Sequence, residues 1–231
     1  MNHLCTICIR KGSRGIKNKN ILKINNIPLF VYTLKQALKS KLFKFIVVST
    51  DSKKIALVAK RYGAYAPFLR PKLLSNDTSG KVKAIRHALK ESEKHFKQKF
   101  DVVTDLDATS PLRSIKDLKL AYKKFVKEKA SILLTACEAK KNPYFNVIEK
   151  KNKRFKVVKS IKNFLRRQDA PKVYEMNASI YIWKRENLLR SDNLFGRKTS
   201  VYLMPRSRSI DIDSALDLKL VKYLIKNKNG I

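Results

Sequence analysis

The sequence has few of the residues that mark non-globular proteins. Its 231 residues include 6 glycines, 7 prolines and 3 cysteines, while 44% are hydrophobic. So little glycine and proline excludes a collagen-like or low-complexity chain, and three cysteines exclude a disulfide-stapled miniprotein. A chain of this length buries roughly 70–75% of the surface that its unfolded form exposes, so it can fold without a metal or a disulfide. We therefore expect one soluble folded domain.

Long apolar runs are also missing, and so is a leader segment. No run approaches the length of about 18 residues that a membrane span needs. The opening MNHLCTICIRK has no basic start, long apolar stretch or small-residue cleavage site. Cys5, Cys8 and Cys137 are too few and odd in number for a secreted disulfide framework, and Cys5 and Cys8 point to opposite faces if they lie on a strand. We expect a cytoplasmic protein with no membrane partner and no redox pair.

Acidic residues are scarce beside basic ones. There are 18 Asp and Glu against 53 Lys and Arg, which gives a formal net charge of +35. Such a charge attracts polyanions, including nucleic acid and nucleotide phosphates. The alternative is that lysine has replaced other solvated surface residues. The lysines run from Lys11 to Lys228 and do not gather in one tail, which favours surface bias and predicts no dedicated nucleic-acid surface.

Short β-branched runs alternate with stretches of helical period, which is typical of an α/β fold with a mainly parallel sheet between two layers of helices. We expect a three-layer, Rossmann-like single domain over 1–231. Residues 138–176 interrupt the pattern with Pro143, Pro171, many charges and short extended patches at 144–149 and 155–160. This segment is expected to be a small β-rich insert that contacts another subunit. The expected strands are 4–9, 45–49, 102–106, 132–136, 178–183 and 199–204, with helices over 29–37, 55–62, 82–89, 115–125 and 214–227.

A cationic turn follows the first expected strand. The segment RKGSRG at 10–15 is followed by Lys17, Lys19 and Asn20. In a parallel sheet the carboxyl ends of the strands face the ligand crevice. There the glycines let the backbone approach an anion, and the cations can neutralise a triphosphate. The spacing matches neither a Walker P-loop nor a Rossmann fingerprint, so a simple turn with solvated lysines is the alternative.

An acidic motif lies near the other end of the chain. In SIDID at 209–213, an extended backbone would place Asp211 and Asp213 on one face and the two isoleucines on the buried face. Two such carboxylates can share a hard cation such as Mg²⁺, with phosphate oxygens and water completing its shell. The alternative is structural, because Asp213 or Ser214 can cap the last helix while Asp217 completes a capping box.

Two further segments carry candidate binding residues. In DLDATSPLR at 105–113, Asp107 can bind a sugar or join the metal site, or the segment is simply a helix entry capped by Ser114 and Asp117. Arg70 lies in a loop where its guanidinium can engage a base edge, or is an ordinary surface arginine. The three histidines have no metal-ligand spacing and are expected on the surface or on helices.

Taken in order, these motifs resemble the CMP-sialic acid synthetases, also called acylneuraminate cytidylyltransferases. Any one of them is weak, but seven occur in order and at compatible separations. They are the opening Arg10 with SRG at 13–15 and KN at 19–20, VVSTD at 47–51, LRP at 69–71 with DT at 77–78, TSPLR at 109–113, RQ at 167–168, NASIYI at 177–182 and SIDID at 209–213.

The resemblance implies that CTP and a nonulosonic acid give a CMP-sugar and pyrophosphate, by in-line attack of the anomeric hydroxyl on the α-phosphorus. It also implies a homodimer joined through the insert. The implied nucleotide-binding residues are Arg10, Ser13, Arg14, Lys19, Asn20, Arg70 and Thr78. Asp211 and Asp213 are implied to bind Mg²⁺ and, with Arg10, to be catalytic. The implied sugar-binding residues are Asp107, Thr109, Asn177 and Tyr181, with Arg167 and Gln168 of a partner subunit.

Two departures point to one branch of the family. Sialic acid enzymes usually carry Gln-Pro before TSPLR, whereas this chain has Asp107-Ala108, and YFN follows Pro143 where a lysine is common. An acidic residue in place of Gln changes what the pocket can donate. Together with NPYFN and YEMNASIYIW, this favours legionaminic acid over sialic acid, with pseudaminic acid and Kdo behind. Rival interpretations are a basic nucleic-acid-binding protein and a glycosyltransferase that uses the D-x-D at 105–107.

Overall fold

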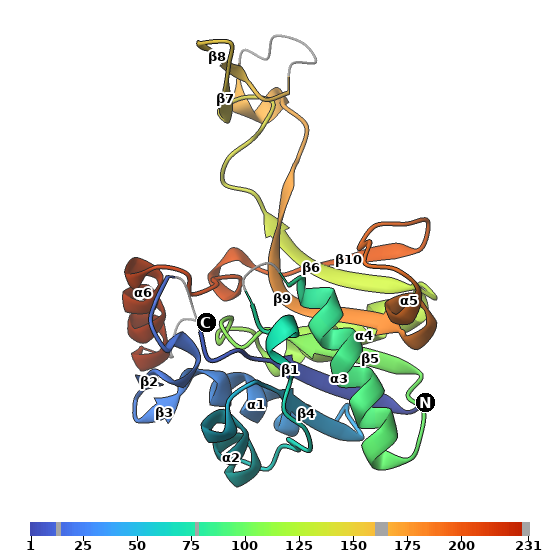
Figure 1. The fold of residues 1–231 in the computed structure, drawn as a ribbon. Coiled ribbons are helices and arrows are strands. Elements are labelled where there is room, and N and C mark those ends of the chain that lie inside the picture. Colours follow the sequence, from blue (N-terminus) through green and yellow to red (C-terminus); the bar gives the residue numbers. More distant parts are fainter. Residues whose placement is uncertain (13–14, 77–78, 160–165, 228–231) are drawn as a thin grey trace.

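The computed structural model describes residues 1–12, 15–76, 79–159 and 166–227. Its centre is a six-stranded sheet with the order β10-β6-β9-β5-β1-β4 (Figure 1). Neighbouring strands run parallel except at β9, which is antiparallel to both β5 and β6. The mainly parallel α/β architecture predicted from the sequence is therefore confirmed. The strands are β1 His3–Cys8, β4 Phe45–Ser49, β5 Val102–Leu106, β6 Ile132–Glu138, β9 Tyr174–Lys184 and β10 Thr199–Leu203.

Helices cover both faces of the sheet, and each layer has its own apolar core. One core joins the sheet to α1 (Leu29–Ser40), α2 (Lys53–Arg61) and α4 (Ile115–Lys127). The other joins it to α3 (Lys81–Phe96) and α5 (Arg185–Arg190). No helix in the described ranges is both long and apolar enough to cross a membrane. Short 3-10 helices lie at η1 Lys19–Ile21, η2 Lys72–Leu74, η3 Arg167–Asp169 and η4 Arg206–Arg208.

Strand β1 shows why the sheet is buried on both sides. Cys5 and Ile7 pack into the first core, while Leu4 and Cys8 pack into the second, as strand alternation requires. All three cysteines are free. The expectation that the histidines lie at the surface or on helices is wrong for His3, which is buried in β1 with its Nε2 2.7 Å from the Thr104 hydroxyl. Burial lowers the pKa of His3 to about 3.

A third apolar cluster joins the last helix, α6 (Ala215–Lys226), to the hairpin of β2 (Lys23–Ile24) and β3 (Ile27–Pro28). Asn25 and Asn26 make the hairpin turn with φ of 48° and 62°. A two-residue turn of this hand suits asparagine and matches the twist of the strands. The cluster also contains Leu112 and Ile212, so the segment before α6 packs against residues near the amino terminus.

Both capping boxes that the sequence offered are present. Ser114 caps α4 and accepts from the Asp117 N–H, and Ser214 caps α6 in the same way with Asp217. In return, the carboxylate of each aspartate accepts from the backbone N–H of the capping serine. Two otherwise unpaired backbone donors are thereby satisfied at the start of each helix. These caps fix where the loops before α4 and α6 end.

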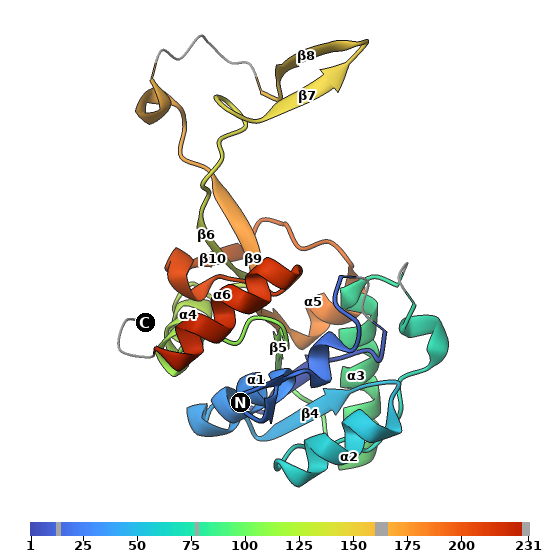
Figure 2. The same cartoon turned by 90° about the vertical axis from the view of Figure 1, so that its left-hand side faces the viewer.

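Between the end of β6 and the start of β9 the chain leaves the body of the protein as an arm, which we define as residues 139–173. It carries a hairpin of β7 (Ile148–Lys151) and β8 (Arg154–Val157) that stands away from the sheet (Figure 2). The extended patch expected at 144–149 begins later, because Asn142 folds residues 144–147 into a turn. Its side chain accepts from the Tyr144 N–H at 2.9 Å and its carbonyl from the Asn146 N–H at 2.9 Å.

Candidate active site

The carboxyl ends of β1 and β4 hold the start of the cationic turn. The Lys11 N–H donates to the Asp51 carboxylate at 2.8 Å, and the Asn20 side chain donates to the Arg10 carbonyl at 3.1 Å. Arg10, Lys11 and Asn20 therefore lie at the edge of the sheet where α/β proteins bind ligands. A cavity of about 430 Å³ opens between these two loops, lined in part by Lys11, Asn20, Asp51 and Lys53. Ser13, Arg14 and Thr78 lie outside the described residues.

The cationic turn meets the acidic motif directly. An ideal Cβ on Gly15 would lie 2.2 Å from the carbonyl oxygen of Asp213, so the two backbones are in contact. The Lys19 ammonium donates to the Ile212 carbonyl and lies 3.0 Å from the Asp213 carboxylate. The two ends of the chain, almost two hundred residues apart, thus converge on one place.

The loop after β5 joins the same cluster. The Ile212 N–H donates to the Thr109 carbonyl at 3.1 Å. Both the Thr109 N–H and its hydroxyl donate to one oxygen of Asp107, at 2.8 and 2.6 Å. Thr109 therefore connects the acidic motif to Asp107, and the loops after β1 and β5 and before α6 surround one site.

The acidic motif at 209–213 belongs to no β-ladder. It leads directly into the cap of α6, where the Asp213 N–H donates to the Asp217 carboxylate at 3.2 Å. The expected burial is present at its end, since Ile212 is fully buried and Asp213 is exposed. The buried Ile212 side chain and the α6 cap thus hold the segment that carries both carboxylates.

Asp211 is the more enclosed of the two carboxylates. Its Oδ1 is buried and accepts no hydrogen bond from the described part of the protein. Burial, followed by the charges of Asp107 and Asp213, raises the pKa of Asp211, while Thr109 and Lys19 act against the rise. An enclosed carboxylate with a free oxygen is costly unless a cation or another donor binds it. This orphaned oxygen fits a hard divalent cation.

The acidic side chains of the described residues offer a cation an incomplete set of ligands. Across residues 1–12, 15–76, 79–159 and 166–227, no group of three or more His, Cys, Asp and Glu side chains is arranged to hold a metal ion. Asp211 and Asp213 therefore supply two carboxylates at most. Hard cations such as Mg²⁺ are usually held in this way, by one or two carboxylates together with substrate phosphates and water.

The sequence reading missed Lys81, which lies in this site. Its ammonium donates to Asp107 Oδ2 at 2.7 Å, lies 3.2 Å from Asp105 Oδ2, and stands 5.2 Å from the centre of the Tyr181 ring. Burial opposes its charge, but the two carboxylates outweigh burial and raise the pKa of Lys81. One signal was available, because Lys81 is the first residue of α3, and a cation is unfavourable at a helix N-terminus unless anions face it.

Arg70 and Asn177 are held inside the protein. Arg70 is 5% exposed and donates to the Ile9 carbonyl at 2.7 Å and the Ser75 hydroxyl at 3.0 Å. It fixes the end of β1 and is not an ordinary surface arginine. Asn177 is buried on β9. Its side-chain oxygen accepts from the Thr135 hydroxyl at 2.6 Å, and its side-chain nitrogen donates to the Ser209 hydroxyl at 2.9 Å. It therefore ties β9 to the segment that leads to Asp211.

Arg167 and Gln168 do not join this cluster within one chain. Both belong to η3 on the arm, and Gln168 is exposed. The arm stands away from the sheet edge where the other predicted residues meet (Figure 2). Their role in a partner subunit stays a prediction.

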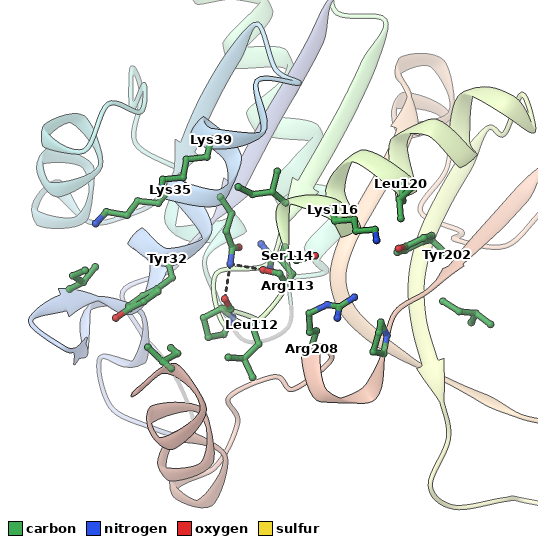
Figure 3. Close-up of a pocket in the computed structure, with 17 residues that line it drawn as sticks. Tyr32, Lys35, Lys39, Leu112, Arg113, Ser114, Lys116, Leu120, Tyr202 and Arg208 are labelled. Carbon is green, nitrogen blue, oxygen red and sulfur yellow. Dashed lines mark hydrogen bonds between the residues drawn. The ribbon is translucent and has the colours of Figure 1, made fainter. Parts of the chain in front are cut away.

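A cavity of about 870 Å³ lies behind the site, between α1, α4 and β10 (Figure 3). Tyr32, Lys35 and Lys116 line it, and none of the predicted site residues does. In its wall the Gln36 side chain donates to the carbonyls of Pro111 and Arg113 at 2.6 and 2.8 Å. Gln36 thus supports, from the rear, the loop that carries Thr109.

The described residues of the site bring the cationic turn next to a group of carboxylates. This arrangement suits the transfer of a phosphorylated group. A family model described as cytidylyltransferase matches residues 4–228. The chain belongs to the cytidylyltransferase family. It is therefore a CTP-dependent nucleotidyltransferase.

Comparison with similar proteins shows which members of the family this cytidylyltransferase resembles. It is 53% identical to the CMP-N,N'-diacetyllegionaminic acid synthase of Campylobacter jejuni, over 98% of this chain and 96% of that protein. It is 34% identical to a pseudaminic acid cytidylyltransferase of Campylobacter jejuni, over 98% and 97% of the two chains. The predicted resemblance to the CMP-sialic acid synthetase family and its legionaminic branch is confirmed.

The fold also has a counterpart among solved structures. The CMP:2-keto-3-deoxy-manno-octonic acid synthetase in complex with CTP superimposes with a TM-score of 0.73, covering 99% of this chain and 100% of that one at 14% identity. At this identity the likeness shows the fold alone. The predicted nucleotidyltransferase fold is confirmed.

Proposed function

We propose that this cytidylyltransferase transfers CMP from CTP to the anomeric hydroxyl of a nonulosonic acid of the legionaminic type and releases pyrophosphate. The observation that carries the proposal is the meeting of Gly15 and Lys19 with Ile212 and Asp213. One site thereby holds cations for a triphosphate next to carboxylates for a metal and a hydroxyl. The free thiols suit a reducing, cytoplasmic setting.

In this proposal the nucleotide lies against the loop after β1. Arg10 and Lys19 face the triphosphate, Asn20 fixes the Arg10 backbone, and Arg70 holds the end of β1. Ser13, Arg14 and Thr78 are further nucleotide contacts implied by the resemblance. Charge-assisted bonds to phosphate are strong and directional, so these residues align the α-phosphorus for attack from the sugar side.

The acidic motif serves the attacking hydroxyl. Asp211 and Asp213 would hold a magnesium ion, which when bound neutralises charge on the triphosphate oxygens. The anomeric oxygen forms a bond to the α-phosphorus while the bond from that phosphorus to the bridging oxygen breaks, and pyrophosphate leaves with the electron pair. Asp211 accepts the hydroxyl proton, a role that suits a carboxylate whose pKa is raised. Positioning and charge, not a covalent intermediate, lower the barrier.

The sugar acid lies between the loop after β5 and strand β9. Asp107, Thr109 and Tyr181 line this region of one chain, and Asn177 braces it from the core. Arg167 and Gln168 of a partner subunit complete it in this proposal. The identity of 53% to a diacetyllegionaminic acid synthase, against 34% to a pseudaminic acid enzyme, supports a legionaminic acid as the substrate.

A substrate panel tests the proposal. The protein is incubated with CTP, Mg²⁺ and in turn legionaminic, sialic, pseudaminic and Kdo acids, and pyrophosphate release is followed. We expect kcat/KM for N,N'-diacetyllegionaminic acid to exceed that for sialic acid by about 100-fold, the discrimination expected from a few polar contacts. ATP in place of CTP is the control. Equal rates with legionaminic and sialic acid would contradict the branch, and no release with any acid would contradict the function.

We also propose that the protein is a homodimer joined through the arm. The arm exposes apolar side chains that a monomer would leave in water, with Ile148 60% and Phe155 68% exposed. Exposed apolar patches of this kind usually mark an interface. Ile148→Ser with Phe155→Ser is expected to convert a dimer to a monomer in light scattering and to reduce activity. Leu57→Ser, on the exposed face of α2, is the control and should leave the dimer intact. A wild-type monomer with full activity would refute the proposal.

A further inference from the structure

We propose that Lys81 is a substrate-contacting residue that donates a hydrogen bond to a neutral oxygen of the sugar acid, either a hydroxyl or an acyl carbonyl. Asp105 and Asp107 are the positioning residues that hold it. The inference rests on the proposed function, because it names the chemical group that the sugar side of the same site recognises. Four observations carry it: the anchoring of the ammonium, its exposure, the local charge and the rigidity of the elements.

The ammonium is anchored on two sides. One N–H donates to Asp107 Oδ2 at 2.7 Å, and Asp105 Oδ2 lies 3.2 Å away. The other oxygen of Asp107 accepts both bonds from Thr109, so the carboxylate is fixed in place. Lys81 keeps its charge throughout the neutral range because both carboxylates favour the protonated form. Asp107 therefore positions Lys81 toward the sugar.

The ammonium keeps N–H groups for a ligand. Asp107 accepts one of its three donors, and Asp105 Oδ2 lies 3.2 Å away as an ion-pair partner that accepts no hydrogen bond from the described residues. The Lys81 side chain is 34% exposed, whereas Asp105 is fully buried. The ammonium thus lies at the boundary between the protein interior and the site, with the Tyr181 ring as a flat wall 5.2 Å from it. A ligand on that wall can accept a remaining N–H.

The carboxylates around the ammonium select a neutral group. The Lys81 charge already faces Asp107 at 2.7 Å and Asp105 at 3.2 Å, while the Arg113 guanidinium is buried and donates to the Asp107 backbone carbonyl. A carboxylate of the sugar acid placed at the same ammonium would be repelled by Asp105 and Asp107. A hydroxyl or an acyl carbonyl accepts the same bond without that repulsion. The carboxylate of the acid must therefore bind elsewhere.

The contact is held by rigid elements. Asp105 lies on the central strand β5, and its other oxygen accepts from the Thr6 hydroxyl of β1 at 2.8 Å. Lys81 begins α3, which packs on the same strands. Arg113 donates to the Asp107 carbonyl and fixes the loop from inside. Sites built in this way keep the geometry that distinguishes one sugar substituent from another.

Kinetics of Lys81→Met test the inference. Loss of a hydrogen bond from a charged donor is expected to raise KM for N,N'-diacetyllegionaminic acid about 10- to 100-fold, with kcat within about threefold and KM for CTP within about twofold. Lys81→Arg keeps the charge and should recover part of the loss. An unchanged KM for the acid would overturn the inference, and so would a loss confined to KM for CTP, which would place the contact on the ribose.

A second measurement separates a neutral oxygen from the carboxylate. Binding of the free acid and of its methyl ester is compared by calorimetry in the wild type and in Lys81→Met. We expect the same fold-loss for both ligands, whereas a loss that disappears with the ester would show a carboxylate contact and refute the inference. If Lys81→Met fails to fold, Lys81→Gln with Asp107→Asn keeps a neutral bonded pair and takes its place. Absence of any turnover by the wild type would instead refute the proposed function.

Discussion

Replacing Asp211 by asparagine is expected to lower turnover about 1,000-fold while KM for CTP changes less than about fivefold. The substitution keeps the shape of the side chain but removes the charge that we assign to cation binding and to the hydroxyl proton. Loss of a group that acts mainly in the transition state lowers kcat, not ground-state affinity, and general-base and metal contributions of this order are typical. Pyrophosphate release at saturating CTP and sugar acid, over a range of Mg²⁺ concentrations, measures the effect.

Asp192→Asn is the matched control for Asp211→Asn. Asp192 is 51% exposed and pairs with Arg86 on another part of the surface. Its loss removes the same charge from the protein and should leave kcat within about twofold, since exposed ion pairs contribute little. Turnover of Asp211→Asn near the wild-type value at saturating Mg²⁺ would show that Asp211 neither holds the cation nor takes the proton.

Gly15→Ala is expected to lower kcat/KM for CTP about 100-fold. The added methyl group would lie 2.2 Å from the Asp213 carbonyl oxygen, so the cationic turn and the acidic motif must separate. Neither neighbour is the end of a flexible side chain, and a displacement of about 1 Å in a site of this kind can cost about 100-fold in rate. Steady-state kinetics with varied CTP measure the effect, and the thermal midpoint of unfolding shows whether the fold is retained.

Gly196→Ala is the matched control for Gly15→Ala. A Cβ at Gly196 meets no atom within 4 Å. This variant has the same change of residue in a loop outside the site, and its kcat/KM should stay within about twofold of the wild type. If Gly15→Ala behaves like Gly196→Ala, the contact between the two ends of the chain is not needed for catalysis.

The fold was largely predictable because its elements obey simple local rules. Buried parallel strands appear as short apolar runs, and helices such as α4 present apolar residues at spacings of three and four. The capping serines Ser114 and Ser214 mark where two helices begin. The prediction failed where a side chain changed the backbone conformation of an expected extended patch. Asn142 folds the start of the patch expected at 144–149 into a turn.

The site was only partly predictable, because some of its residues act through neighbours that are distant in sequence. Little in the sequence distinguishes Lys81 from the other lysines, because its ion pairs with Asp105 and Asp107 form only in the folded chain. Arg70 was predicted as a binding residue, but its hydrogen bonds to the Ile9 carbonyl and to Ser75 at the end of η2 could not be read from the sequence. Asp211 and Asp213 were predicted from their spacing, and the cap of α6 and the burial of Ile212 hold the segment that carries them.

The antiparallel strand β9 has a consequence for the order in which the chain can fold. β5 and β6 share no ladder, and β9 is the strand that joins the β1–β4–β5 half of the sheet to the β6–β10 half. β9 pairs with β5 through Ile180–Lys184, so the edge of β5 lacks its full partner until the ribosome has added Lys184. Sequence-distant pairing of this kind is slow, so the nascent amino-terminal half has an open strand edge, which makes a chain prone to aggregation.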